Sequence, residues 1–191
     1  MKDLIKFDSP EQKERVLFFN EQVDQKTIGE LSKEIIAINE LDDYLEKYYA
    51  LQELIYKRKP IKIFIDSYGG YVYQCFGLLS IMDASKTPIW TYVTGAAMSC
   101  GFLILIHGHR RFAYKLGTPL YHQVGGGANG KIKDVEEELV EMKRLQKKIE
   151  ELTLAKTKIT AKKLEDIYVK KIDWYMTAEE ARELGVVDEI I

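Results

Sequence analysis

Residues 89–106 decide the fold, and they read IWTYVTGAAMSCGFLILI. The run begins with β-favouring residues at 89–93, continues through mostly small residues at 94–101, and ends in an unbroken apolar stretch at 102–106. This order predicts a strand, a tight turn and a buried helix. Ser99 stands where the helix would begin, so backbone N–H groups without helical partners would face whatever its hydroxyl attacks.

This stretch alone leaves two interpretations of Ser99 open. A serine nucleophile needs preorganised hydrogen-bond donors for its oxyanion, and a helix N-terminus can supply them. Serine is also a favoured N-cap residue, and small residues at a turn can serve packing alone. The nucleophile-elbow pattern would place a glycine where this chain has Ala97. A catalytic role therefore requires a base, an orienting acid and a second oxyanion donor from elsewhere in the chain.

The stretch before it repeats the same order of elements. A strand is predicted at 61–65, followed by the turn DSYGG at 66–70 and a helix at about 72–82. Two strand–turn–helix units in succession predict right-handed βαβ crossovers and a parallel sheet, which is an α/β fold. Sites in such sheets lie beyond the carboxyl ends of the strands, so Gly69, Gly70 and Ser99 are expected to share one. The glycines could equally form only a tight turn, and the lysine of a phosphate-binding loop is absent.

The remaining elements organise the chain as one domain over 15–191. Residues 1–14 are polar and are expected to form a flexible leader. A strand at 15–19 and a helix at about 27–38 follow, and a second helix is predicted at 40–58, where Pro60 stops it. The longest helical pattern spans about 133–156. Its apolar stripe suits packing on another subunit or across its own domain; it comprises Val135, Leu139, Met142, Leu145, Ile149, Leu152 and Ala155.

Composition excludes several classes of function. The formal charge of −2 over 191 residues gives no global basic surface for nucleic acid. Cys75 and Cys100 lie in apolar contexts and are interpreted as reduced core thiols of a cytoplasmic protein. The first residues lack the apolar core of a signal peptide, and no apolar run is long enough to cross a bilayer, so we expect no membrane partner.

Three histidines and one aspartate are the candidates for acid–base chemistry. His122 ends an apolar segment just before a glycine run, which suits a general base, although a satisfied half-buried histidine is equally consistent. His107 and His109 are interpreted as solvated turn residues, because no neighbouring ligand completes a metal site. Asp173 lies in a loop before a capped helix, and could orient the base or be simply solvated.

Four motifs, in order along the chain, resemble the proteolytic subunits of the Clp protease family. They are SYGG at 67–70, GAAMSCG at 95–101, HQ at 122–123 before the glycine run, and DWYMTAEEA at 173–181. The closing LGVVD at 184–188 is also similar to that family, and the match runs from about 15 to 191. Four motifs with compatible spacings are a more specific signal than any one of them.

The resemblance implies a catalytic triad of Ser99 as nucleophile, His122 as base and Asp173 as orienter. The backbone N–H groups of Gly70 and Cys100 would form the oxyanion hole. The implied fold is the crotonase-like one, with repeated βαβ units and a long protruding handle helix, here 133–156, that joins two rings. Family members form two stacked seven-membered rings around a chamber that degrades unfolded polypeptides.

The resemblance also implies partners. A separate ATP-driven unfoldase would feed the chamber, so this chain itself would need no cofactor or metal. Phe64, Phe112 and Tyr114 match positions of the hydrophobic pocket that docks the unfoldase. The chain departs from the family at Tyr68, which replaces a proline, at Lys62 in the docking pocket, in a short leader, and in an apparent insertion at 40–58.

The sequence therefore predicts a cytoplasmic, homo-oligomeric serine endopeptidase of the Clp type. Two alternatives remain at this point. One is an inactive or regulatory ring-forming subunit, which the departures would suit. The other is a crotonase-like acyl-CoA enzyme on the same fold, which the Ser99, His122 and Asp173 set argues against.

Overall fold

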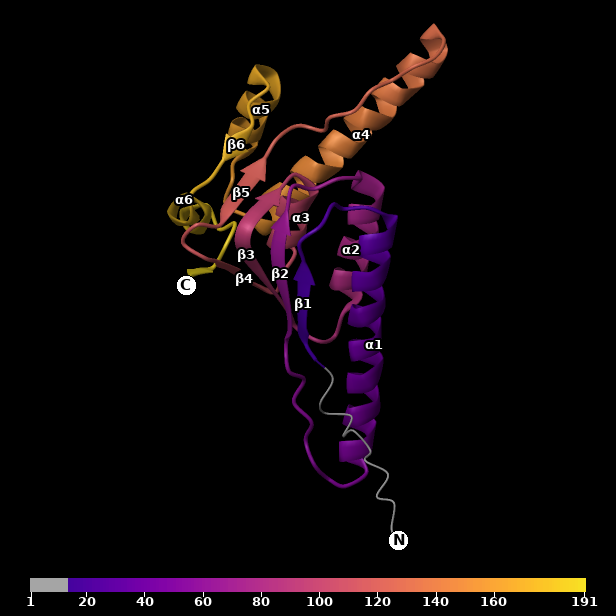
Figure 1. Ribbon diagram of the computed structural model, residues 1–191, viewed down its shortest axis with the longest axis vertical. Helices are drawn as coiled ribbons and strands as arrows, with labels where there is room; N and C mark the ends of the chain where they lie inside the picture. The colour runs from indigo at the N-terminus through magenta and orange to yellow at the C-terminus, as the bar shows by residue number, and fades with distance from the viewer. Residues whose placement is uncertain (1–13) are drawn as a thin grey trace.

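A computed structural model describes residues 14–191, and it confirms an α/β fold built on a parallel sheet (Figure 1). The sheet has the order β1-β2-β3-β4-β7, and all these pairs are parallel. Its strands are β1 (Val16–Phe19), β2 (Ile61–Ser67), β3 (Ile89–Met98), β4 (Arg110–Ala113) and β7 (Glu189–Ile190). Two further strands, β5 (Thr118–Tyr121) and β6 (Trp174–Tyr175), extend the sheet from the far end of β3.

β3 is the longest strand because it serves two partners on one side. Its first half pairs with β4 over Trp90 to Val93, and its second half pairs with β5 over Ala96 to Met98. The change of partner falls at Gly95, where a Cβ atom would lie 2.5 Å from Oδ1 of Asp66. That carboxylate accepts the Ala96 N–H at 2.8 Å. β3 therefore carries the chain past the main sheet and delivers Ser99 beyond its carboxyl edge.

The helices α1 (Gln25–Ala50) and α2 (Val72–Ala84) cover one face of the sheet (Figure 1). Alternate side chains of β2, among them Ile61, Ile63 and Ile65, are buried, as expected for a strand in a sheet. All seven residues of α3 (Cys100–Ile106) are buried, so this helix is an apolar anchor behind the turn at Ser99. At the C-terminal end, α5 (Ala161–Lys170) and α6 (Ala178–Glu183) complete the chain.

The handle helix is α4 (Ile132–Lys156), which projects away from the domain (Figure 1). Its buried residues, Leu145, Gln146, Ile149 and Thr153, all lie in its C-terminal half. The N-terminal half of the predicted apolar stripe is exposed, as Leu139 illustrates. The buried half of the stripe thus packs across its own domain, and packing of the exposed half on another subunit stays a prediction.

The predicted second helix at 40–58 is wrong. α1 runs unbroken from Gln25 to Ala50, after an N-cap at Asp24 that shares a capping box with Thr27. No proline or glycine interrupts the chain between 30 and 50, and Asn39 does not cap a new helix. Its amide instead donates to the Ile35 carbonyl and to Ser85 after α2. Residues 51–60 turn back without regular structure towards β2.

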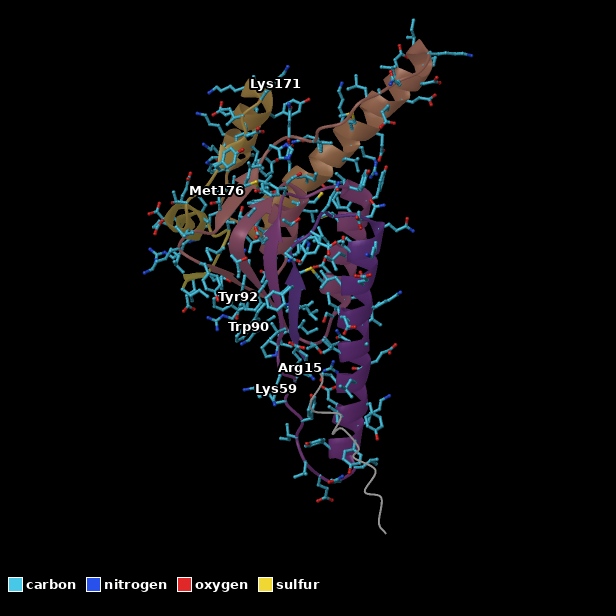
Figure 2. All side chains as sticks on the ribbon, viewed as in Figure 1. Arg15, Lys59, Trp90, Tyr92, Lys171 and Met176 are labelled. Atoms are coloured by element: carbon cyan, nitrogen blue, oxygen red, sulfur yellow. The ribbon has the colours of Figure 1, made fainter. Side chains whose placement is uncertain are left out.

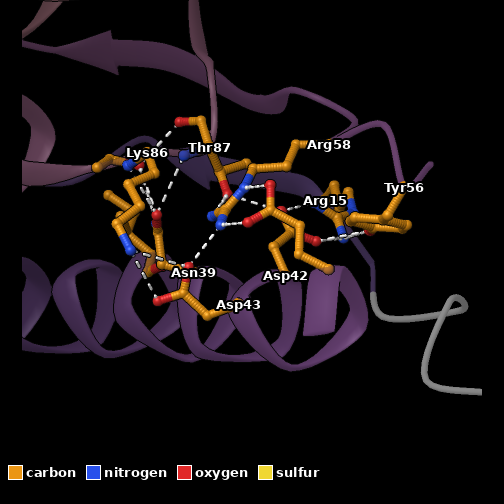
Figure 3. Close-up of polar contacts among 11 residues, drawn as sticks. Arg15, Asn39, Asp42, Asp43, Tyr56, Arg58, Lys86 and Thr87 are labelled. Carbon is orange, nitrogen blue, oxygen red and sulfur yellow. Dashed lines mark hydrogen bonds and ion pairs between the residues drawn. The ribbon is translucent and has the colours of Figure 1, made fainter. Parts of the chain in front are cut away.

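A buried carboxylate of α1, that of Asp42, binds both this returning segment and the residue before β1 (Figure 3). Asp42 is fully buried and accepts four hydrogen bonds, two from Arg15 at 2.6 and 2.9 Å, one from Tyr56 at 2.7 Å and one from Thr87 at 2.6 Å. We call these four residues the Asp42 clamp. Burial alone would raise the pKa of Asp42, but the hydrogen bonds outweigh it and lower that pKa below its usual value. The clamp thus joins α1, which carries Asp42, to the start of β1 and to the 51–60 segment.

Two further expectations concern the ends and surface of the chain. The predicted leader, 1–14, lies outside the described residues except for Glu14. Within residues 14–191, no helix is both long and apolar enough to cross a membrane. Cys75 and Cys100 are buried and free, as predicted for core thiols.

Candidate active site

Ser99 occupies a strained turn between β3 and α3. Its φ of 55° and ψ of −119° lie where non-glycine residues are rarely found, and such strain is concentrated at functional sites. The surrounding backbone fixes this conformation, because the Ser99 N–H donates to the Leu120 carbonyl at 3.0 Å and the Ser99 carbonyl accepts from Phe102 at 3.0 Å. The hydroxyl makes no capping hydrogen bond to α3. The N-cap interpretation therefore does not account for this serine.

A cavity of about 280 Å³ brings four of the five predicted site residues together. Ser99, His122, Gly70 and Cys100 all line it. The rest of its wall is largely apolar, and includes Val72, Phe102, Leu103, Tyr121 and Ile149. Asp173 is exposed and does not line the cavity. The sequence patterns did not predict that Ile149, from the handle helix, would form part of this wall.

The two glycines before α2 bring bare backbone close to Ser99. Gly69 and Gly70 have φ values of 96° and 152°, which favour glycine. A Cβ atom on Gly69 would lie 2.7 Å from the Ser99 Cβ and 3.0 Å from the Cys100 nitrogen. Among the described residues, the N–H groups of Gly70 and Cys100 have no recorded acceptor. Two unpaired donors beside one hydroxyl are what an oxyanion hole requires.

His122 and Asp173 lie on neighbouring segments but are not hydrogen-bonded to each other. β5 and β6 are antiparallel, with Tyr121 opposite Trp174. Continued by one step, this register would place half-buried His122 opposite Asp173, although the strand pairing itself ends at Tyr121 and Trp174. Within residues 14–191, no hydrogen bond or ion pair joins either side chain to the other or to Ser99. Catalytic hydrogen bonds often tighten only when substrate binds, so the triad stays a prediction.

The prediction for the other two histidines is half wrong. His107 is 3% exposed, at the end of α3, where its Nδ1 lies 3.2 Å from the Leu103 carbonyl. Burial lowers its pKa, and its Nε2 is 3.7 Å from an oxygen of Asp83. The apolar run at 102–106 carries straight into this residue, which explains the burial. His109 is exposed, as expected, and its Nδ1 accepts the Ile89 N–H at 3.0 Å. Neither lines the cavity.

The predicted docking residues belong to a larger aromatic surface. Phe18, Phe64, Tyr92 and Phe112 share one register level across β1 to β4, with successive ring centroids 5.5, 4.6 and 4.5 Å apart. Trp90 and Tyr92 lie on the sheet face away from α1 and α2 (Figure 2). Phe64 and Phe112 therefore share one surface, while Tyr114 is exposed beyond β4 without a recorded ring contact in the described chain. The signal for the missed members was the presence of aromatic residues in the predicted strands at 15–19 and 89–93.

No group of three or more histidine, cysteine or acidic side chains in the described range is arranged to hold a metal ion. Independently of that, the cavity presents a hydroxyl, an imidazole and the backbone N–H groups of Gly70 and Cys100. These are the components of acyl transfer through an oxyanion.

Comparison with known proteins places these features in a family. A sequence model of the Clp protease family matches residues 10–191. An ATP-dependent Clp protease proteolytic subunit from Bacteroides fragilis is 28% identical over 181 residues, which cover 93% of this chain and 79% of that protein. A protein of the same name from Bacteroides thetaiotaomicron is 28% identical over 180 residues, or 93% and 74% of the two chains.

Proposed function

Because this chain belongs to the Clp protease family, we propose that it is a serine endopeptidase that cleaves unfolded polypeptides. The names of its relatives point to a peptidase, which is a hydrolase. The observation that carries the serine mechanism is the strained Ser99 turn, beside His122 and the two free N–H groups in one cavity. The apolar wall of that cavity suits an apolar side chain of the substrate.

The proposed roles follow from the chemistry of each group. His122 accepts the proton of the Ser99 hydroxyl as the oxygen attacks the scissile carbonyl carbon. The N–H groups of Gly70 and Cys100 stabilise the oxyanion that forms. His122 then donates the proton to the leaving amine, which leaves an acyl ester on Ser99. Water, deprotonated by His122, hydrolyses this ester and restores the hydroxyl. Asp173 orients the imidazole and stabilises its cationic form.

The proposal includes assembly into two stacked rings through the handle helix. Its support is the exposed outer half of α4, where Ile132, Leu139 and Val140 would be an aggregation liability on a monomer. A closed chamber would restrict cleavage to unfolded chains, delivered by a separate ATP-driven unfoldase. The aromatic surface around Phe64 and Phe112 is the proposed docking site for that unfoldase, and the cytoplasm is the proposed location.

The exposed position of Asp173 favours one second candidate, an inactive ring-forming subunit. In that case His122 would lack an orienting partner even in the assembled particle. The two candidates make opposite predictions for peptide cleavage.

The test is hydrolysis of a fluorogenic peptide by the purified, assembled protein. We expect measurable turnover that falls by several orders of magnitude in Ser99→Ala, because triad residues act as a unit. Ser80→Ala is the matched control, since Ser80 is exposed on α2 and its hydroxyl bonds only to the Phe76 carbonyl. Absence of turnover in assembled wild type would favour the inactive subunit. Turnover that survives in Ser99→Ala would remove the serine mechanism.

A further inference from the structure

The buried face of α4 carries a polar side chain that links the handle helix to the active-site segment. Gln146 is 7% exposed and lies between the buried residues Leu145 and Ile149 along the helix. Its Oε1 accepts the backbone N–H of Val124 at 2.8 Å. Its Nε2 donates to Oε1 of Glu150 at 2.7 Å. A buried amide with both ends in hydrogen bonds has a fixed orientation.

The Val124 contact lies two residues after His122 in the chain. Tyr121 is the last residue of β5 and is held by its pairing with Trp174. Beyond it, residues 122–130 have no regular structure and include three consecutive glycines at 125–127. In the part of the chain that the structure describes, no other recorded hydrogen bond holds the backbone from 122 to 130. His122 therefore lies between two anchors, β6 on one side and Gln146 on the other.

We infer that Gln146 is a positioning residue that fixes His122 relative to Ser99 and couples the handle helix to catalysis. The inference rests on the proposed serine peptidase function. Without the acceptor, the Val124 N–H would lose its partner and the glycine-rich segment could rotate about Tyr121. A displacement of about 1 Å at a catalytic group costs on the order of 100-fold in rate. Gln146 does not line the cavity that holds Ser99, so we expect it to act through the segment that carries His122 and Val124.

The surroundings of Gln146 allow its amide and the carboxylate of Glu150 to be exchanged between the two positions. Glu150 is its hydrogen-bond partner, and burial together with the charge of Glu150 raises the pKa of the nearby Tyr121 hydroxyl. That hydroxyl is buried and has no aligned hydrogen-bond partner in the described residues. The groove on the other side of Gln146, towards α5, is lined by the titratable groups Lys143, Lys147, Glu165 and Tyr168. Among residues 14–191, Glu150 is the one carboxylate hydrogen-bonded to the amide.

The first test compares Gln146→Leu with wild type in two assays. We expect kcat for peptide hydrolysis to fall about 10- to 100-fold while KM changes little. The rate at which a fluorophosphonate labels Ser99 should fall by the same factor, because labelling also needs a correctly placed base. Glu151→Gln is the matched control, since Glu151 is exposed on the same helix and pairs only with Lys148 at its surface.

The second test exchanges the two partners and remains decisive if Gln146→Leu does not fold. In Gln146→Glu, two carboxylates meet, and one of them must take up a proton because like charges disfavour ionisation. The ratio of its labelling rate to that of wild type should therefore rise as the pH is lowered. Adding Glu150→Gln gives the new carboxylate an amide donor and keeps the Val124 acceptor. This double variant should regain at least half of the wild-type rate at pH 7.

The outcomes separate the inference from the proposed function. Wild type that is not labelled at Ser99 would overturn the proposed function and, with it, this inference. Wild-type rates in a folded, equally assembled Gln146→Leu would overturn the inference alone. A double exchange that stays as slow as Gln146→Glu would also overturn it, since the hydrogen bonds would then be irrelevant.

Discussion

The Asp42 clamp gives a sharp prediction for stability, through the substitution Asp42→Ala. The change removes the acceptor of four hydrogen bonds and leaves the Arg15 guanidinium, whose side chain is only 10% exposed, without its carboxylate. Removing one partner of a buried pair costs about 3–5 kcal/mol. A chain of this size loses about 2–4 °C of melting temperature per kcal/mol, so we expect a decrease of about 6–20 °C.

The neighbouring residue provides the control. Asp43 pairs with Arg58 and Lys86, but its side chain is 39% exposed, and Arg58, although only 8% exposed, keeps Glu46 as a second partner. Ion pairs of an exposed carboxylate contribute about 0–1 kcal/mol. Asp43→Ala should therefore lower the melting temperature by no more than about 4 °C. The assay is thermal unfolding followed by circular dichroism at pH 7, with the protomer concentration held constant. Equal shifts for the two variants would refute the reasoning that burial makes the clamp strong.

The same clamp predicts a dependence on pH. The pKa of Asp42 is lowered in the folded chain, so the carboxylate contributes stability above its unfolded pKa of about 3.9. That contribution is lost as the pH falls through the lowered pKa. The difference in melting temperature between wild type and Asp42→Ala should be constant from about pH 5 to 8 and should narrow in more acid solution. A difference that grows on acidification would contradict the sign of the pKa shift.

Three further predictions concern the site and the assembly. Gly69→Ala should lower kcat by at least about tenfold. Its Cβ would lie 2.7 Å from the Ser99 Cβ, and the backbone strain costs about 1–3 kcal/mol. A wild-type rate would contradict the close approach. His122→Ala should abolish peptide cleavage while His109→Ala leaves it within about twofold in kinetic assays, and the reverse result would move the base elsewhere. The side chain of Val140 is 68% exposed, and Val140→Asp should split the assembled particle in analytical ultracentrifugation. The melting temperature of the protomer should not fall. An intact particle would show that this part of α4 is not in the ring contact.

Much of the framework followed from local patterns. The strands β2 and β3 and the turn at Ser99 were predictable because apolar runs, small residues and glycines mark them directly in the sequence. The break predicted at Asn39 failed because a side chain that can cap a helix can also bond sideways, here to Ser85. The burial of His107 was missed because its charged neighbours at 110–111 outweighed the apolar run before it.

The parts that could not be predicted depend on contacts between distant segments. β6 has only two residues, yet its register with β5 sets where the segment of Asp173 lies relative to that of His122. Strands this short leave no alternation to detect. Gln146 occupies an apolar helix face, where its spacing indicates nothing about Val124, 22 residues away. The one hint in the sequence is that Gln146 directly follows Leu145 of the predicted apolar stripe.

The central claim is that Ser99 is a catalytic nucleophile, and fluorophosphonate labelling followed by peptide mapping tests it most directly. We predict a single modified peptide that contains Ser99. The same reagent should leave Ser99→Ala unmodified. Labelling at another residue, or no labelling of the folded and assembled protein, would contradict the claim.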